Sequence, residues 1–126
     1  MNWMWVLVLS LTGLVMGLVT SLVGLPGSVE PLVWIVFYVA WGVLVIRREL
    51  RPFLTPLVAS ALSGVWTGGT QYLLRDQYLA NNPWYADQLT EQGMTLSGTV
   101  LFGVGMGVVW GLIVGGICWG IAKRRG

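Results

Sequence analysis

The chain has 126 residues, of which 56% are hydrophobic and only 10% are charged, whereas about 25% are charged in an ordinary soluble domain. The seven basic and five acidic residues form short clusters, separated by uncharged stretches of 29, 16, 23 and 31 residues. This pattern predicts an integral membrane protein. Histidine is absent, which excludes His-based acid–base chemistry and His–metal ligation. The single Cys118 excludes an intrachain disulfide.

The uncharged stretches predict four transmembrane helices, because a crossing needs about 20 apolar residues. We expect an all-α fold, in which residues 1–126 form a single transmembrane domain with spans at about 3–25, 31–46, 52–74 and 96–122. A cleaved signal peptide is the alternative for the first span. It is disfavoured because the segment lacks a basic leading region and its apolar run is too long.

The charges also predict how the chain crosses the membrane. Basic residues accumulate in cytoplasmic loops, and six of the seven fall on one side if both termini are cytoplasmic, namely Arg47, Arg48, Arg51, Lys123, Arg124 and Arg125. We therefore expect a multi-pass protein of the bacterial inner membrane with residues 75–95 outside. Because the basic residues form two short groups rather than a stripe, nucleic acid is not an expected partner.

The outer loop before the last span contains a predicted short interfacial helix. Asn82 and Pro83 suit its first positions, and Gly93 suits its end. Trp84 and Tyr85 would then lie at the depth of the lipid headgroups. Two interpretations remain: the helix covers the outer end of the bundle, or Trp84 and Tyr85 contact lipid or a partner protein.

The third span is the most polar of the four. One face of it carries five side chains that can form hydrogen bonds: Ser60, Ser63, Thr67, Thr70 and Gln71. They could line a path for an ion or small solute, or they could bridge neighbouring helices at about 0.6 kcal/mol each. We expect bridging, because Gly64 and Gly68 on the same helix permit close packing.

The last span is rich in glycine at regular spacing. Gly103, Gly107, Gly111 and Gly115 recur every fourth residue, a pattern that allows helix backbones to approach closely. Gly98, Gly105, Gly116 and Gly120 lie on a second, roughly opposite arc, so we expect this helix to pack against two neighbours. Between the arcs lies a bulky ridge that should face lipid or another subunit: Met106, Trp110, Ile113 and Ile117.

The spans lack the groups that usually carry membrane chemistry. No Asp, Glu, Lys or Arg falls inside any of them, and such residues typically mark proton relays and ion pathways. We therefore expect no enzyme activity, no metal and no required cofactor. Trp66 and Trp110 lie near the middle of their spans, where each indole needs an acceptor. Core packing is the favoured use, with a bound lipid, quinone or carotenoid-type pigment as the alternative.

The second half of the chain resembles a known family. Leu50-Arg51-Pro52-Phe53, the small-residue span, Gln77-Tyr78-Leu79-Ala80-Asn81-Asn82-Pro83 and the glycine-rich span ending in Lys123-Arg124-Arg125 carry the resemblance. They are similar to a bacterial family of small four-span membrane proteins of unknown function. The resemblance covers roughly residues 50–126 and implies a topology but no catalytic or binding residues.

These observations lead to two hypotheses about function. The first is a non-catalytic accessory or scaffolding subunit of a larger inner-membrane complex, whose partners are membrane lipids and other membrane-protein subunits. The alternative is a small oligomeric channel or facilitator lined by the third-span hydroxyls.

Overall fold

The computed structural model describes residues 1–24, 28–83 and 95–125. Within these ranges the chain forms five helices and no strands: α1 (Trp3–Leu22), α2 (Glu30–Arg47), α3 (Leu54–Leu73), α4 (Arg75–Asn81) and α6 (Leu96–Arg125). The predicted all-α fold is confirmed. The short interfacial helix expected around Trp84 and Tyr85 lies outside the described residues.

Three helices of the described ranges, α1, α2 and α6, are long and apolar enough to cross a membrane. This composition indicates a membrane protein. α3 is of similar length, at 20 residues, but its hydroxyl, amide and glycine residues make it too polar to belong with the other three.

Local sequence explains where several helices begin and end. The side chain of Asn2 accepts a hydrogen bond from the Trp5 amide and so caps the start of α1. Pro31 stands in the first turn of α2, where its missing N–H costs no helical bond. At the other end of α1, Gly24 adopts a left-handed conformation with a φ of 83°, which glycine tolerates without a steric cost.

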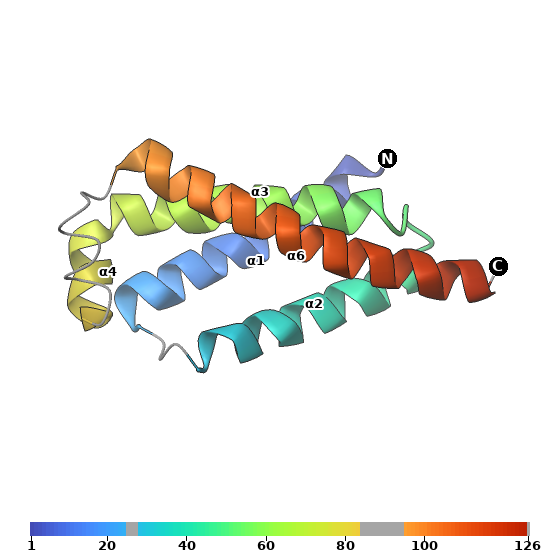
Figure 1. Cartoon of the computed structure of the whole chain (residues 1–126), viewed down its shortest axis with the longest axis horizontal. Helices are drawn as coiled ribbons and strands as arrows, with labels where there is room; N and C mark the ends of the chain where they lie inside the picture. The colour runs from blue at the N-terminus through green and yellow to red at the C-terminus, as the bar shows by residue number, and fades with distance from the viewer. Residues whose placement is uncertain (25–27, 84–94, 126) are drawn as a thin grey trace.

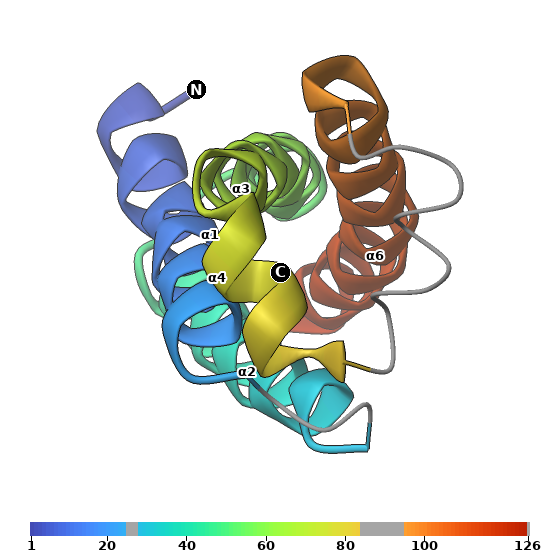
Figure 2. The same ribbon diagram turned by 90° about the vertical axis from the view of Figure 1, so that its left-hand side faces the viewer.

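α3 is the central helix of the bundle. It lies between α1 and α6, and α2 runs along the remaining side, as the end-on view shows (Figure 2). α4 crosses the end of the bundle and contacts α1 there. The most polar long helix is therefore also the one most completely surrounded by other helices.

The core lies where all four long helices meet. Tyr38, Trp41 and Val45 of α2 fill its centre. They pack against residues from each of the other long helices, namely Val6, Leu9, Ala59, Val114 and Cys118. The rest of α2 is mostly exposed, so this helix is held mainly through its second half.

The charged residues separate between the two ends of the bundle. Both chain termini lie at the same end (Figure 1), together with the connection from α2 to α3 and its basic cluster, Arg47, Arg48 and Arg51. The other end holds the start of α2 and all of α4. The basic cluster that follows α2 and the basic residues in the last turn of α6 therefore lie at the same end of the bundle.

Candidate functional site

The contact between α3 and α6 is an approach of two backbones. A Cβ atom added to Gly103 would collide with the carbonyl oxygen of Gly64, and one added to Gly64 would collide with that of Gly103. The four regularly spaced glycines of α6 lie along α3 in this way: Gly103 opposite Gly64, Gly107 opposite Ser60, Gly111 opposite Leu57, and Gly115 opposite Phe53, the residue just before α3. Because one set of numbers rises as the other falls, the two helices are antiparallel.

The second glycine arc of α6 has a different environment. A Cβ atom at Gly105, Gly116 or Gly120 would meet no described atom within 4 Å, and one at Gly98 would meet only Thr95. The second close neighbour expected from the sequence is therefore not formed within the described part of the chain. The bulky ridge of Met106, Trp110, Ile113 and Ile117 is exposed as well.

α1 packs on the opposite side of α3, again through glycine. A Cβ atom at Gly13 would collide with the backbone of Ser63, and one at Gly17 would lie 2.7 Å from the Cβ atom of Thr70. The hydroxyl of Thr67 donates a hydrogen bond of 2.9 Å to the carbonyl oxygen of Gly13. Because Gly13 has no side chain, α3 lies close enough for the Thr67 hydroxyl to reach the Gly13 carbonyl oxygen.

Further polar contacts extend this interface along the helices. The indole of Trp66 donates to the Ser10 hydroxyl at 3.2 Å. Near the far end, the Gln71 amide donates to the Thr20 hydroxyl at 3.0 Å. Residue numbers rise together on the two helices, so α1 and α3 are parallel.

Ser60 and Ser63 are the most deeply buried members of the predicted polar face, at 0% and 1% exposure. The Ser60 hydroxyl forms a hydrogen bond of 2.9 Å with the hydroxyl of Tyr38 on α2. Ser63 donates to the carbonyl oxygen of Ser60 within its own helix. Ser60 thus bonds to α2, Thr67 and Gln71 bond to α1, Ser63 bonds within α3, and Thr70 packs against Gly17 of α1.

An aromatic cluster surrounds the Tyr38–Ser60 bond. The Tyr38 ring stacks on Trp34 at 5.6 Å and on Trp110 at 6.1 Å between ring centroids, and it meets Trp41 edge-on at 5.0 Å. Trp110 and Trp66 therefore each have a protein partner, Tyr38 and Ser10 respectively. The sequence did not predict this contact between Trp34 and Tyr38.

Two asparagines join α4 to the end of α1. Asn82, only 2% exposed, donates from one amide nitrogen to the carbonyl oxygens of Thr20 and Tyr78, both at 2.7 Å. Asn81 donates to the carbonyl oxygen of Ser21 at 2.9 Å. These bonds satisfy carbonyls that a helix leaves unpaired in its last turn. In the described residues, Asn82 therefore connects α4 to α1, a contact that the sequence interpretation did not anticipate.

Three other features of the sequence add no contacts to this arrangement. Trp84 and Tyr85, the predicted lipid or partner contacts of the outer loop, lie outside the described residues. Within the described ranges, no three Asp, Glu or Cys side chains gather closely enough to hold a metal ion. Cys118 is buried with a free thiol.

The sequence did contain a signal for the α1–α3 contact. Gly13, Gly17 and Ser21 recur every fourth residue, which is the same small-residue pattern that stands out in α6. It is easy to overlook because Leu and Val fill the intervening positions. The α3 residues that meet this face of α1 are Ser63, Thr67 and Thr70, whereas Ser60, Gly64 and Gly68, which have the same spacing, face α6.

Removing hydroxyls from α3 should affect stability and not permeability. In Ser60→Ala and Thr67→Val variants, each lost interhelical bond should cost about 0.6 kcal/mol and at most ~1.7 kcal/mol. Ser63→Ala loses only a bond within α3 and should cost less. Unfolding in detergent measures this cost, and ion flux into liposomes measures permeability. The wild type and all three variants should show no flux above empty liposomes. Flux in the wild type that these substitutions abolish would contradict the packing role.

The chain was compared with protein-family models, with curated proteins and with solved structures, and none of these comparisons finds a match.

Proposed function

We propose that the protein is a four-span, non-catalytic accessory or scaffolding subunit of a larger complex in the bacterial inner membrane, with both termini in the cytoplasm. The four-span arrangement requires α3 to cross the bilayer despite its polarity. Its 20 residues extend about 30 Å at 1.5 Å per residue, which equals the thickness of the hydrocarbon core.

The surroundings of α3 support its crossing. Polar groups are tolerated inside a membrane where they bond to neighbouring helices instead of facing lipid. Thr67, Gln71 and Ser60 bond to α1 and α2 in this way, and the glycine contact with α6 covers the side of Gly64 and Gly68. The parallel α1 and α3 and the antiparallel α6 also fit a chain that crosses four times.

The observation that carries the proposed role is the contrast between the inside and the outside of the bundle. The polar groups of α3 are used for internal contacts, whereas α6 leaves a wide apolar face and three glycines uncovered. Glycines on a transmembrane helix typically mark a surface where another helix packs closely. We infer that this face of α6 meets a helix of a partner subunit.

The alternative, a channel lined by the third-span hydroxyls, has less support. Ser60 and Ser63 have 0% and 1% exposure and lie against helices α6 and α1, where Gly107 and Gly13 bring the backbones together. A water-filled path needs room beside such groups. The close helix contacts occupy that room.

The proposed role predicts that other membrane proteins purify with this one. We expect tagged protein, extracted from its native membrane in a mild detergent, to migrate as a large complex with partners in fixed stoichiometry. Size-exclusion chromatography followed by mass spectrometry of the peak measures this. Migration as a lone chain, or only as copies of itself, would contradict the accessory role.

A pair of variants makes this test specific to the uncovered face of α6. Gly116→Leu adds bulk where no described atom beyond the local helix backbone lies within 4 Å, so it should leave the chain folded but release the partners. Ile113→Leu, on the neighbouring exposed ridge, changes shape without changing volume and should retain them. Equal partner recovery from both variants would exclude this face as the contact surface.

A further inference from the structure

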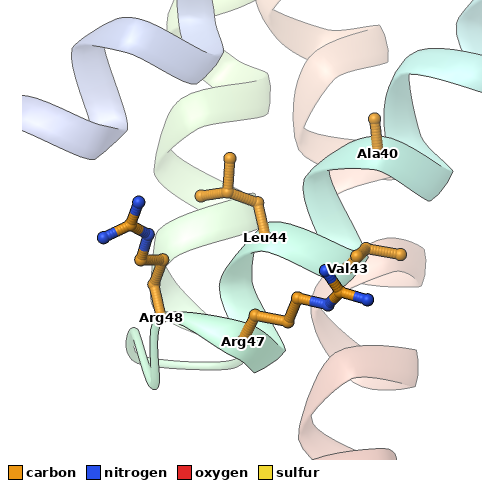
Figure 3. Close-up of a pocket in the computed structure, with 5 residues that line it drawn as sticks. All are labelled: Ala40, Val43, Leu44, Arg47 and Arg48. Atoms are coloured by element: carbon orange, nitrogen blue, oxygen red, sulfur yellow. The ribbon is translucent and has the colours of Figure 1, made fainter.

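A hollow lies on the outer surface of α2, close to the end of the bundle that carries both termini. Its volume is about 420 Å³, and it is lined by Ala40, Val43, Leu44, Arg47 and Arg48. Leu44 lies between the two arginine side chains, and Ala40 lies one turn further along the helix (Figure 3). Ala40, Val43 and Leu44 thus form an apolar floor of the hollow, and the guanidinium groups of Arg47 and Arg48 lie next to it.

The two arginines carry positive charge that the described residues do not neutralise by an ion pair. Arg47 and Arg48 are both exposed, and the Arg48 guanidinium lies 5.2 Å from the centroid of the Trp5 ring on α1. That aromatic contact orients the group without cancelling its charge. The neighbouring carboxylate, Glu49, lines a different hollow, between the end of α2 and the end of α6.

We propose that this hollow binds one anionic phospholipid of the cytoplasmic leaflet. The lipid phosphate would bond to the guanidinium groups of Arg47 and Arg48, and an acyl chain would lie on Ala40, Val43 and Leu44. The inference rests on the proposed membrane placement, which puts these arginines at the cytoplasmic interface.

Chemistry and position both favour this ligand. Guanidinium groups bind phosphate oxygens through paired hydrogen bonds, and basic residues just inside the cytoplasmic surface attract anionic lipids. A free phosphate ion would not contact the apolar floor, and an acyl chain alone would not bond to the arginines. Only an anionic lipid uses both parts of the hollow.

The binding can be tested with the full-length protein in detergent. Native mass spectrometry measures the affinity for phosphatidylglycerol, with phosphatidylcholine of the same acyl chains as the neutral comparison. We expect one tightly retained phosphatidylglycerol and much weaker retention of phosphatidylcholine. In Arg47→Gln/Arg48→Gln the affinity for phosphatidylglycerol should fall about tenfold or more, given the contribution of each basic residue near an anionic lipid.

Two further variants distinguish specific binding in the hollow from nonspecific attraction of an anionic lipid to positive charge. Lys123→Gln/Arg124→Gln removes the same charge from the same end of the bundle but not from the hollow, and it should retain the lipid. Ala40→Trp fills the apolar floor from an exposed position and should weaken phosphatidylglycerol binding with both arginines intact. Circular dichroism checks that every variant is helical.

Three results would overturn the proposal. These are equal loss of lipid in the two double variants, equal retention of the two lipids, and saturable binding of inorganic phosphate that Ala40→Trp does not weaken. The last would assign the arginines to a free anion. Because the measurement needs no partner protein, lipid binding by a chain that purifies alone would support this site while contradicting the accessory role.

Discussion

Replacing Gly107 with leucine should destabilise the bundle more than most single substitutions in this chain. A Cβ atom at Gly107 would collide with the carbonyl oxygen of Ser60 and would lie 3.1 Å from the Cα atom of Ala61. Backbone atoms cannot rotate away as a side chain can, so α3 and α6 must separate. Overpacking of this kind typically costs 1–3 kcal/mol and sometimes more.

The cost should include more than the local collision. If α6 moves away from α3, the matching contact between Gly103 and Gly64, one turn away, opens as well. Trp110 would also lose its place beside Tyr38. Thermal unfolding of the purified variant, followed by circular dichroism, measures the loss, and a low yield of folded protein is the expected accompanying sign.

Gly116→Leu is the matched control on the same helix. No described atom lies within 4 Å of a Cβ atom at this position, so the purified chain should be as stable as the wild type. A modest gain is also consistent, because glycine is less favourable in a helix than leucine by up to about 1 kcal/mol. Equal destabilisation by the two substitutions would show that the glycines do not define the α3–α6 interface.

The lengths of the uncharged stretches were the most informative property of the sequence. It predicts helices close to those observed, with α1 at Trp3–Leu22 against an expected 3–25 and α2 at Glu30–Arg47 against 31–46. Long apolar runs leave few alternatives to a helix in a bilayer, since every backbone group must bond internally. The small helix α4 was not predicted, because seven residues with mixed polarity carry no clear period.

The pairing of helices was harder to predict than their positions. Glycine spacing in α6 marks two possible contact faces, but spacing does not say which neighbour, if any, covers each one. The answer depends on complementary surfaces elsewhere in the chain, such as Gly64 on α3 and Ser63 opposite Gly13 of α1. Such pairs are distant in sequence and can be matched only in three dimensions.

The polar face of α3 illustrates the same limit. Helical spacing places Ser60, Thr67 and Gln71 on one side, but it does not reveal that Tyr38 of α2 reaches the first and α1 the other two. A tyrosine within an apolar span is a weak signal, because aromatic residues are common in membrane helices. The acceptors in α1 include a glycine carbonyl, which no residue pattern identifies.

The central claim is that α3 crosses the membrane as the polar centre of a four-span bundle. Glu49 lies before α3 and Asp76 lies after it, in α4, and both are exposed. If α3 crosses, these two positions are on opposite sides of the membrane. If α3 does not cross, they are on the same side.

Cysteine labelling in intact cells measures this difference directly. A membrane-impermeant maleimide should modify the Asp76→Cys variant in intact cells. It should modify the Glu49→Cys variant only after the membrane is opened by permeabilisation. The unaltered chain gives the background, because the native Cys118 is only 3% exposed. Labelling of Asp76→Cys alone is the result that the four-span account predicts, and labelling of both positions, or of neither, before the membrane is opened would contradict it.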